Sequence, residues 1–149
     1  MPNRRTHQIA GAVAGAGYSS AITAGRPGRQ RLPEALGAAV SGFFSGRWPD
    51  IVDPPNYPGH RGPGHALIPN LVAACLLYQY GNQWSNWCRT QAKQFQLLSY
   101  YAVTKESKAQ CLANAQGYLI LAGIPAGLIA GLWSHLGLDF MTPAGLPLA

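Results

Sequence analysis

Apolar residues along this chain fall into long runs separated by charged segments or by segments rich in Pro and Gly. The first run, Ile9 to Ala24, is rich in Ala and Gly and carries no charge. A loop with three Arg follows, from Gly25 to Pro33. Pro33 and Glu34 fit the first turn of a second helix that ends near Arg47, because Pro is favoured where helical N–H groups have no partner.

The middle of the chain predicts one irregular segment and two shorter helices. Between Pro49 and Gly64, Pro and Gly are too dense for a helix or a central strand. A third helix is expected from His65 to about Tyr80, and Gly81 to Asn86 is interpreted as a turn. The polar, amphipathic stretch from Trp87 to Val103 predicts a peripheral helix.

The last helix is expected to begin after Lys105 and to reach about Phe140. With the preceding segments it predicts an all-α fold, a small bundle of four to five helices. A length of 149 residues suits a single domain spanning residues 1–149.

Small residues recur every fourth position in the first and last helices. The last helix carries Gly123, Gly127, Gly131, His135 and Asp139, and the first carries a shorter series beginning at His7. Small residues at this spacing let helix backbones approach closely. If the two helices pack antiparallel along these stripes, His7 and His135 reach the same end of the bundle.

A shortage of charge suggests that much of the surface faces lipid. Hydrophobic residues make up 48% of the chain and charged residues 11%, and no charge occurs between Lys108 and Asp139. Soluble domains carry roughly 25% charged residues, and about 20 apolar residues span a bilayer. The sequence therefore predicts a membrane-embedded bundle; a soluble bundle with an unusually apolar core is the alternative.

The net charge of +6 comes from scattered Arg and Lys without a long basic run. Loops that flank membrane helices explain these residues better than a nucleic-acid surface, so no nucleic-acid partner is expected. The three Cys lack C-x-x-C spacing, which argues against a disulfide framework and against a thiolate zinc site.

The candidate chemistry lies in His and Asp. All of these residues fall in, or at the edge of, three short segments: the start of the first helix, the Pro/Gly segment and the end of the last helix. The four His and three Asp are His7, His60, His65, His135, Asp50, Asp53 and Asp139.

These residue types suit one metal site at one end of the bundle. His135 and Asp139 are four residues apart on a helix, so both can reach one ion. The predicted metal ligands are His7, Asp50, His60, His65, His135 and Asp139. Mixed His and Asp ligands suit zinc best, with manganese as an alternative, and their number allows one or two divalent ions.

The same constellation favours hydrolysis. Two-metal sites favour phosphoester hydrolysis. Asp50 or Asp53 is the predicted general base, and Arg61 is placed to stabilise developing negative charge. Taken singly, each residue has a structural explanation: a buried core histidine, a turn-forming aspartate or a helix cap. Their joint clustering favours the metal site.

Four motifs together resemble the YdjM-type family of inner-membrane proteins, which are described as metal-dependent hydrolases and as LexA-binding. The motifs are an early Thr-His, a Pro-Asp after a small-residue helix, a His-Arg-Gly-x-x-His and a final His-x-x-x-Asp followed by Thr-Pro-x-Gly. They correspond here to Thr6-His7, Pro49-Asp50, residues 60–65 and residues 135–145. The family often has Asp-x-Asp, whereas this chain has Asp50-x-x-Asp53.

The resemblance implies a bacterial or phage-encoded inner membrane protein with hydrolase chemistry. The order of the ligands is also similar to that of zinc-dependent phospholipase C, which points to phosphoester or phospholipid-like substrates. The expected partners are the lipid bilayer and an unknown small-molecule or lipid substrate, and association into a homo-oligomer is allowed. The alternative is a non-enzymatic membrane protein whose metal is structural, or which binds a regulator or another partner.

Overall fold

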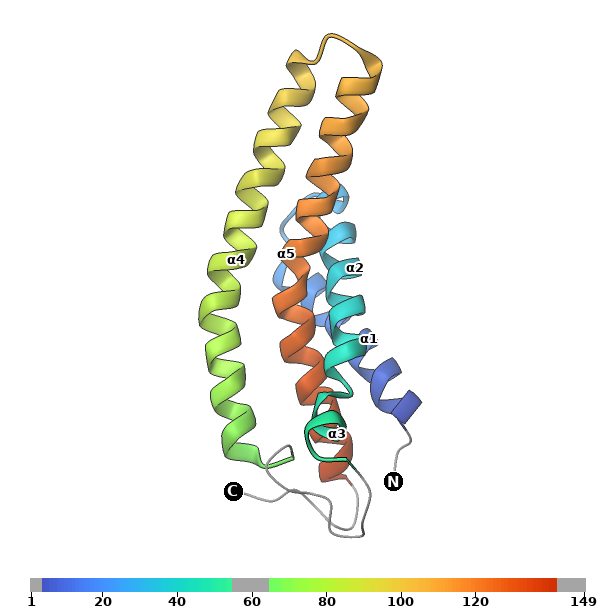
Figure 1. Ribbon diagram of the computed structural model, residues 1–149, viewed down its shortest axis with the longest axis vertical. Coiled ribbons are helices and arrows are strands. Elements are labelled where there is room, and N and C mark those ends of the chain that lie inside the picture. The colour runs from blue at the N-terminus through green and yellow to red at the C-terminus, as the bar shows by residue number, and fades with distance from the viewer. Residues whose placement is uncertain (1–3, 55–64, 142–149) are drawn as a thin grey trace.

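The computed structural model describes residues 4–54 and 65–141, and every element in this part of the chain is a helix. Figure 1 shows a bundle in which two long helices form an antiparallel hairpin that extends beyond the others. The all-α prediction is confirmed. The helices are α1 (Arg4–Ile22), α2 (Gly28–Ser45), α3 (Trp48–Val52), α4 (Leu67–Tyr101) and α5 (Lys105–Phe140).

The predicted turn between Gly81 and Asn86 is wrong, because α4 continues through it as one helix. Gly81 is buried against α5, and a Cβ at this position would lie 2.5 Å from the Cβ of Pro125. An isolated Gly costs a helix only about 1 kcal/mol relative to Ala. Gly81 therefore marks a close contact between helices rather than a chain reversal.

Two further boundaries differ from prediction. α2 begins at Gly28, so Pro33 lies inside the helix and not in its first turn. The residues from Pro49 to Val52, expected to be irregular, belong to the short helix α3, which has Pro49 at its start. A proline there removes an N–H that would have no helical partner in any case.

Three helices meet along their small residues. α1 and α5 run antiparallel, the arrangement under which the sequence places His7 and His135 at one end, and a Cβ on Gly15 would lie 3.2 Å from the Cα of Gly127. α2 packs against both helices and is the partner that the sequence did not indicate. A Cβ on Gly11 would overlap the carbonyl oxygen of Gly42, and one on Gly127 would overlap that of Ala38. No larger residue fits at these contacts without moving a backbone.

Among the described helices the backbone of α4 approaches only that of α5, with Arg89 reaching Glu34 of α2, so the bundle is a tight three-helix unit with a fourth helix on one side. α5 is long and apolar enough to cross a membrane, and it is the one such helix in the described residues. Large apolar side chains are also exposed on the neighbouring helices, including Val13, Val40, Leu71 and Leu76. The start of α1, the short helix α3, the start of α4 and the end of α5 all lie at the same end of the bundle (Figure 1).

Candidate metal centre

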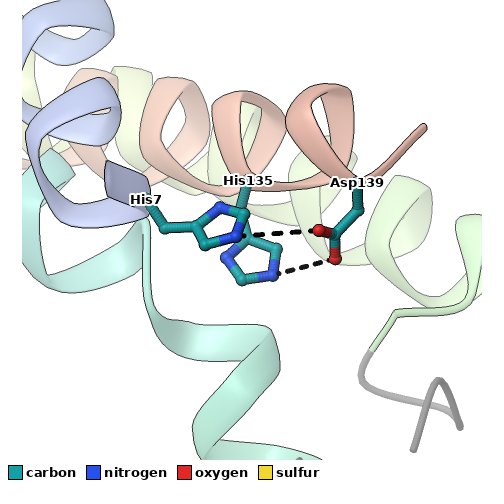
Figure 2. Close-up of side chains that lie close together, drawn as sticks. All are labelled: His7, His135 and Asp139. Carbon is teal, nitrogen blue, oxygen red and sulfur yellow. Dashed lines mark ion pairs between the residues drawn. The ribbon is translucent and has the colours of Figure 1, made fainter. Parts of the chain in front are cut away.

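The last turns of α5 carry the first two residues of the centre. His135 and Asp139 are four residues apart, so they lie on one face of the helix. Nε2 of His135 lies 3.3 Å from Oδ2 of Asp139. His135 is fully buried and Asp139 is 5% exposed. Figure 2 shows both side chains pointing away from the axis of α5 toward the start of α1.

The backbone at the end of α2 fixes the orientation of His135. Nδ1 of His135 lies 2.8 Å from the carbonyl oxygen of Gly46. Because a carbonyl only accepts, Nδ1 carries the proton and donates it to Gly46, and Nε2 faces the centre. Metal-binding histidines commonly donate their second ring N–H in this way, which fixes both the tautomer and the angle of the ring.

His7 comes from the first turns of α1 and lies against His135. The two rings stack with centroids 3.9 Å apart (Figure 2). Nε2 of His7 lies 3.6 Å from Oδ1 of Asp139, so the two carboxylate oxygens face different histidines. Burial lowers the pKa of His7, and the adjacent His135 lowers it further. A lowered pKa keeps the imidazole neutral near pH 7, as a metal ligand must be.

His65, just before α4, completes the cluster from the opposite side. Its Nε2 lies 3.4 Å from Nε2 of His135, 3.4 Å from Oδ2 of Asp139 and 3.5 Å from Oδ1 of Asp50 on α3. Its Nδ1 faces Asp53, with 3.6 Å between Nδ1 and Oδ2. Asp53 therefore lies behind His65, where a carboxylate can orient the ring, and not among the converging atoms.

The converging atoms form two overlapping groups, and each group could hold an ion. One comprises His7, His135 and Asp139, and the other comprises Asp50, His65 and His135. A tetrahedral ion with bonds of about 2.0–2.2 Å holds its ligand atoms about 3.3–3.6 Å apart. Several of the separations, from 3.3 Å between His135 and Asp139 to 3.6 Å between His7 and Asp139, fall in this range, and that between His135 and Asp50 is longer, at 3.8 Å. The residues present therefore fit a divalent metal.

A buried nitrogen supports the same interpretation. Nδ1 of His7 has no hydrogen-bond partner among the described residues, although His7 is only 3% exposed. A purely structural histidine at this burial normally has both ring nitrogens satisfied. Nδ1 of His7 is thus open to a ligand from outside the described residues, while Nε2 faces Asp139.

Five of the six predicted metal ligands lie together, although they come from positions 7 to 139 of the chain. The sixth, His60, and the predicted charge-stabilising Arg61 lie outside the described residues. Sequence reasoning missed the carbonyl of Gly46, because every residue carries a carbonyl and no side-chain pattern marks the one that matters. It also placed Asp53 among the catalytic candidates without indicating that it faces the second nitrogen of His65.

The model of a family described as "YdjM inner membrane protein" matches residues 1–149, the whole chain. No curated protein and no solved structure matches.

Proposed function

The chain belongs to the YdjM inner membrane protein family, and we propose that it is a metal-dependent hydrolase working at the membrane. The proposed substrates are phosphoesters or phospholipid-like molecules. The proposal rests above all on the convergence of buried His and Asp side chains at spacings that suit a metal ion.

The number of ligands favours catalysis over a structural role. Each group offers three protein ligands among the described residues. Catalytic zinc sites typically have three protein ligands and leave a position for water or substrate, whereas structural sites have four. The absence of Cys from both groups points the same way, because structural zinc sites are usually rich in thiolates.

The protein's own groups can be given roles. A bound divalent ion would supply Lewis acidity and a more acidic water. Asp50 is the least buried of the clustered side chains, at 12% exposed, and is the proposed general base. Asp53 would hold His65 in the orientation in which its Nε2 faces the centre. Arg61 remains the proposed residue that stabilises negative charge on the substrate.

Zinc is the proposed metal, with manganese as the alternative.

The number of ions depends on how the two groups share their residues. Nε2 of His135 belongs to both groups, and one ring nitrogen binds one ion, so the two groups cannot both be complete at the same time. One oxygen of Asp139 faces His7 and the other faces His135, so Asp139 could serve one ion or two.

The alternative is a non-enzymatic membrane protein whose metal holds the helix ends together. Complete burial of His65 and His135 is the observation that favours it, because a substrate must reach the ion. In that case α1, α3, α4 and α5 would be joined by the metal at one end of the bundle.

A paired assay separates the two functions. Detergent-purified protein loaded with zinc or manganese is tested on phosphomonoesters, phosphodiesters and phospholipids, beside the Asp139→Asn variant and the Ser134→Ala control on the same helix. Hydrolysis that requires the metal and Asp139 supports the enzyme. Stoichiometric metal with no hydrolysis of any of these classes would contradict it and favour the structural role.

A further inference from the structure

A second group of charged residues lies away from the metal centre and lines a groove. The groove has a volume of about 440 Å³ and lies between the start of α2 and the polar middle of α4, with Leu119 of α5 at its floor. Its charged lining consists of Arg26, Arg89 and Lys93. Ligand sites commonly measure about 300–1,000 Å³, so the groove is large enough for a small polar group.

Glu34 holds two of these cations in place. Its carboxylate is 1% exposed and accepts from Nη2 of Arg89 at 2.7 Å and from Nε of Arg89 at 3.1 Å. It also accepts from Nη1 of Arg26 at 3.0 Å. Ordering long side chains usually costs entropy when a ligand binds, and this anchoring reduces that cost for both Arg.

The groove keeps a positive charge after this pairing. Three cations line it, and Glu34 neutralises only one of them. Lys93 is exposed and forms no ion pair with any residue in the described ranges. Asn86 and Thr90 add polar groups to the same wall. Fixed guanidinium groups beside a free ammonium form a surface that suits a phosphate group.

The position of the groove along the bundle, relative to the membrane–water interface, indicates which molecule carries the phosphate. Large exposed side chains on the first half of α4, such as Leu71 and Leu76, are apolar, whereas the groove is lined mainly by polar and charged residues. Trp84 and Trp87 lie at this transition, and Trp is enriched where a protein meets the membrane–water interface. A group at this height on a membrane protein faces the lipid headgroups.

We propose that this groove binds the headgroup phosphate of an anionic phospholipid, with Arg26, Arg89 and Lys93 as the contacts. The site lies several helical turns from the metal centre along α2 and α5, and it does not depend on the hydrolase function. It would hold the bundle at a defined depth in an anionic membrane.

Native mass spectrometry of the delipidated full chain in detergent tests the proposal. The protein is titrated with phosphatidylglycerol, with phosphatidylcholine and with inorganic phosphate. Lys93→Gln is the test variant because its side chain is exposed, so the fold should survive. Lys105→Gln, at the far end of the hairpin, removes the same charge away from the groove.

The expected result is tighter binding of phosphatidylglycerol than of phosphatidylcholine. Lys93→Gln should weaken phosphatidylglycerol binding about fivefold, because one basic residue near an anionic surface contributes about 1 kcal/mol. Thr90→Glu adds a negative charge to the groove wall and should weaken phosphatidylglycerol binding more. Lys105→Gln and Gln94→Glu change the charge of residues that do not line the groove, so they should leave this binding nearly unchanged. Equal losses in Lys93→Gln and Lys105→Gln would overturn the site, and displacement of the lipid by an equal concentration of inorganic phosphate would overturn the lipid as its source.

Discussion

Two buried polar clusters in this bundle are built differently. Around Glu34, carboxylate and guanidinium atoms lie 2.7 to 3.3 Å apart, the range of direct hydrogen bonds between charged groups. Around His135, the His and Asp atoms lie 3.3 to 3.8 Å apart and face a common centre. In the first cluster the buried carboxylate is fully paired, whereas the second has the spacing of groups arranged around an ion.

A structural ion pair can therefore be distinguished from a metal centre by the distances between its polar atoms and by the direction in which those atoms point. Arg26 and Arg89 satisfy the carboxylate of Glu34, so the polypeptide alone explains the burial of that carboxylate. His7 keeps a buried nitrogen without a partner in the described residues, and the one close bond of His135 goes to the backbone and aims its Nε2 inward. Uncompensated burial of this kind is costly unless a ligand offsets it.

Breaking the Glu34 cluster should have the largest effect on stability. Arg89→Met leaves a buried carboxylate with only Arg26, so the free energy of unfolding should fall by about 3 kcal/mol. Metal content should not change. Denaturant unfolding in detergent, with metal analysis of the same samples, checks both outcomes.

The double variant Glu34→Leu with Arg89→Met is the control. It removes the carboxylate of Glu34 together with the guanidinium of Arg89, so no buried carboxylate is left with too few partners, and most of the lost stability should be recovered. If metal content falls in step with stability in Arg89→Met, the two clusters are not independent and the comparison fails.

Overpacking the contact of the three helices should cost less and should disturb the metal centre. A Cβ on Gly127 would overlap the carbonyl oxygen of Ala38, so Gly127→Leu must push α2 away from α5. We expect a loss of about 1–3 kcal/mol, together with reduced metal content, because Gly46 at the end of α2 orients His135. Thermal unfolding and metal analysis measure the two effects.

Gly117→Leu is the matched control on the same helix, since a Cβ there meets nothing within 4 Å. It should leave stability and metal content nearly unchanged. Equal behaviour of the two leucine variants would show that tight packing along α5 does not support the centre.

Removing Asp53 should have the smallest effect on the fold and a selective one on the metal. Asp53→Ala takes away the carboxylate that faces Nδ1 of His65, and groups in such positions typically contribute about 10- to 100-fold to metal affinity. Competition with a chromogenic chelator measures the affinity. An unchanged metal affinity would show that Asp53 does not support metal binding at the centre.

Much of this architecture follows from the sequence because its signals are periodic and local. The spacing of small residues in α1 and α5 places His7 and His135 at one end of the bundle if the two helices pack antiparallel, as they do, and the lack of charge between Lys108 and Asp139 predicts membrane association. The continuity of α4 could not be predicted, because Gly81 is explained by Pro125 on another helix. Gly46 and Glu34 were missed for the same reason: their roles depend on partners distant in the chain.

The most direct test of the central claim is metal analysis of the detergent-purified protein with and without His135. We expect stoichiometric zinc or manganese in the wild-type protein. Thermal stability should fall when a chelator removes the metal, because ligands from distant segments link metal binding to folding. His135→Ala should lose the metal and should no longer respond to the chelator. A wild-type protein that takes up no stoichiometric metal, and whose melting is the same with and without chelator, would contradict the account.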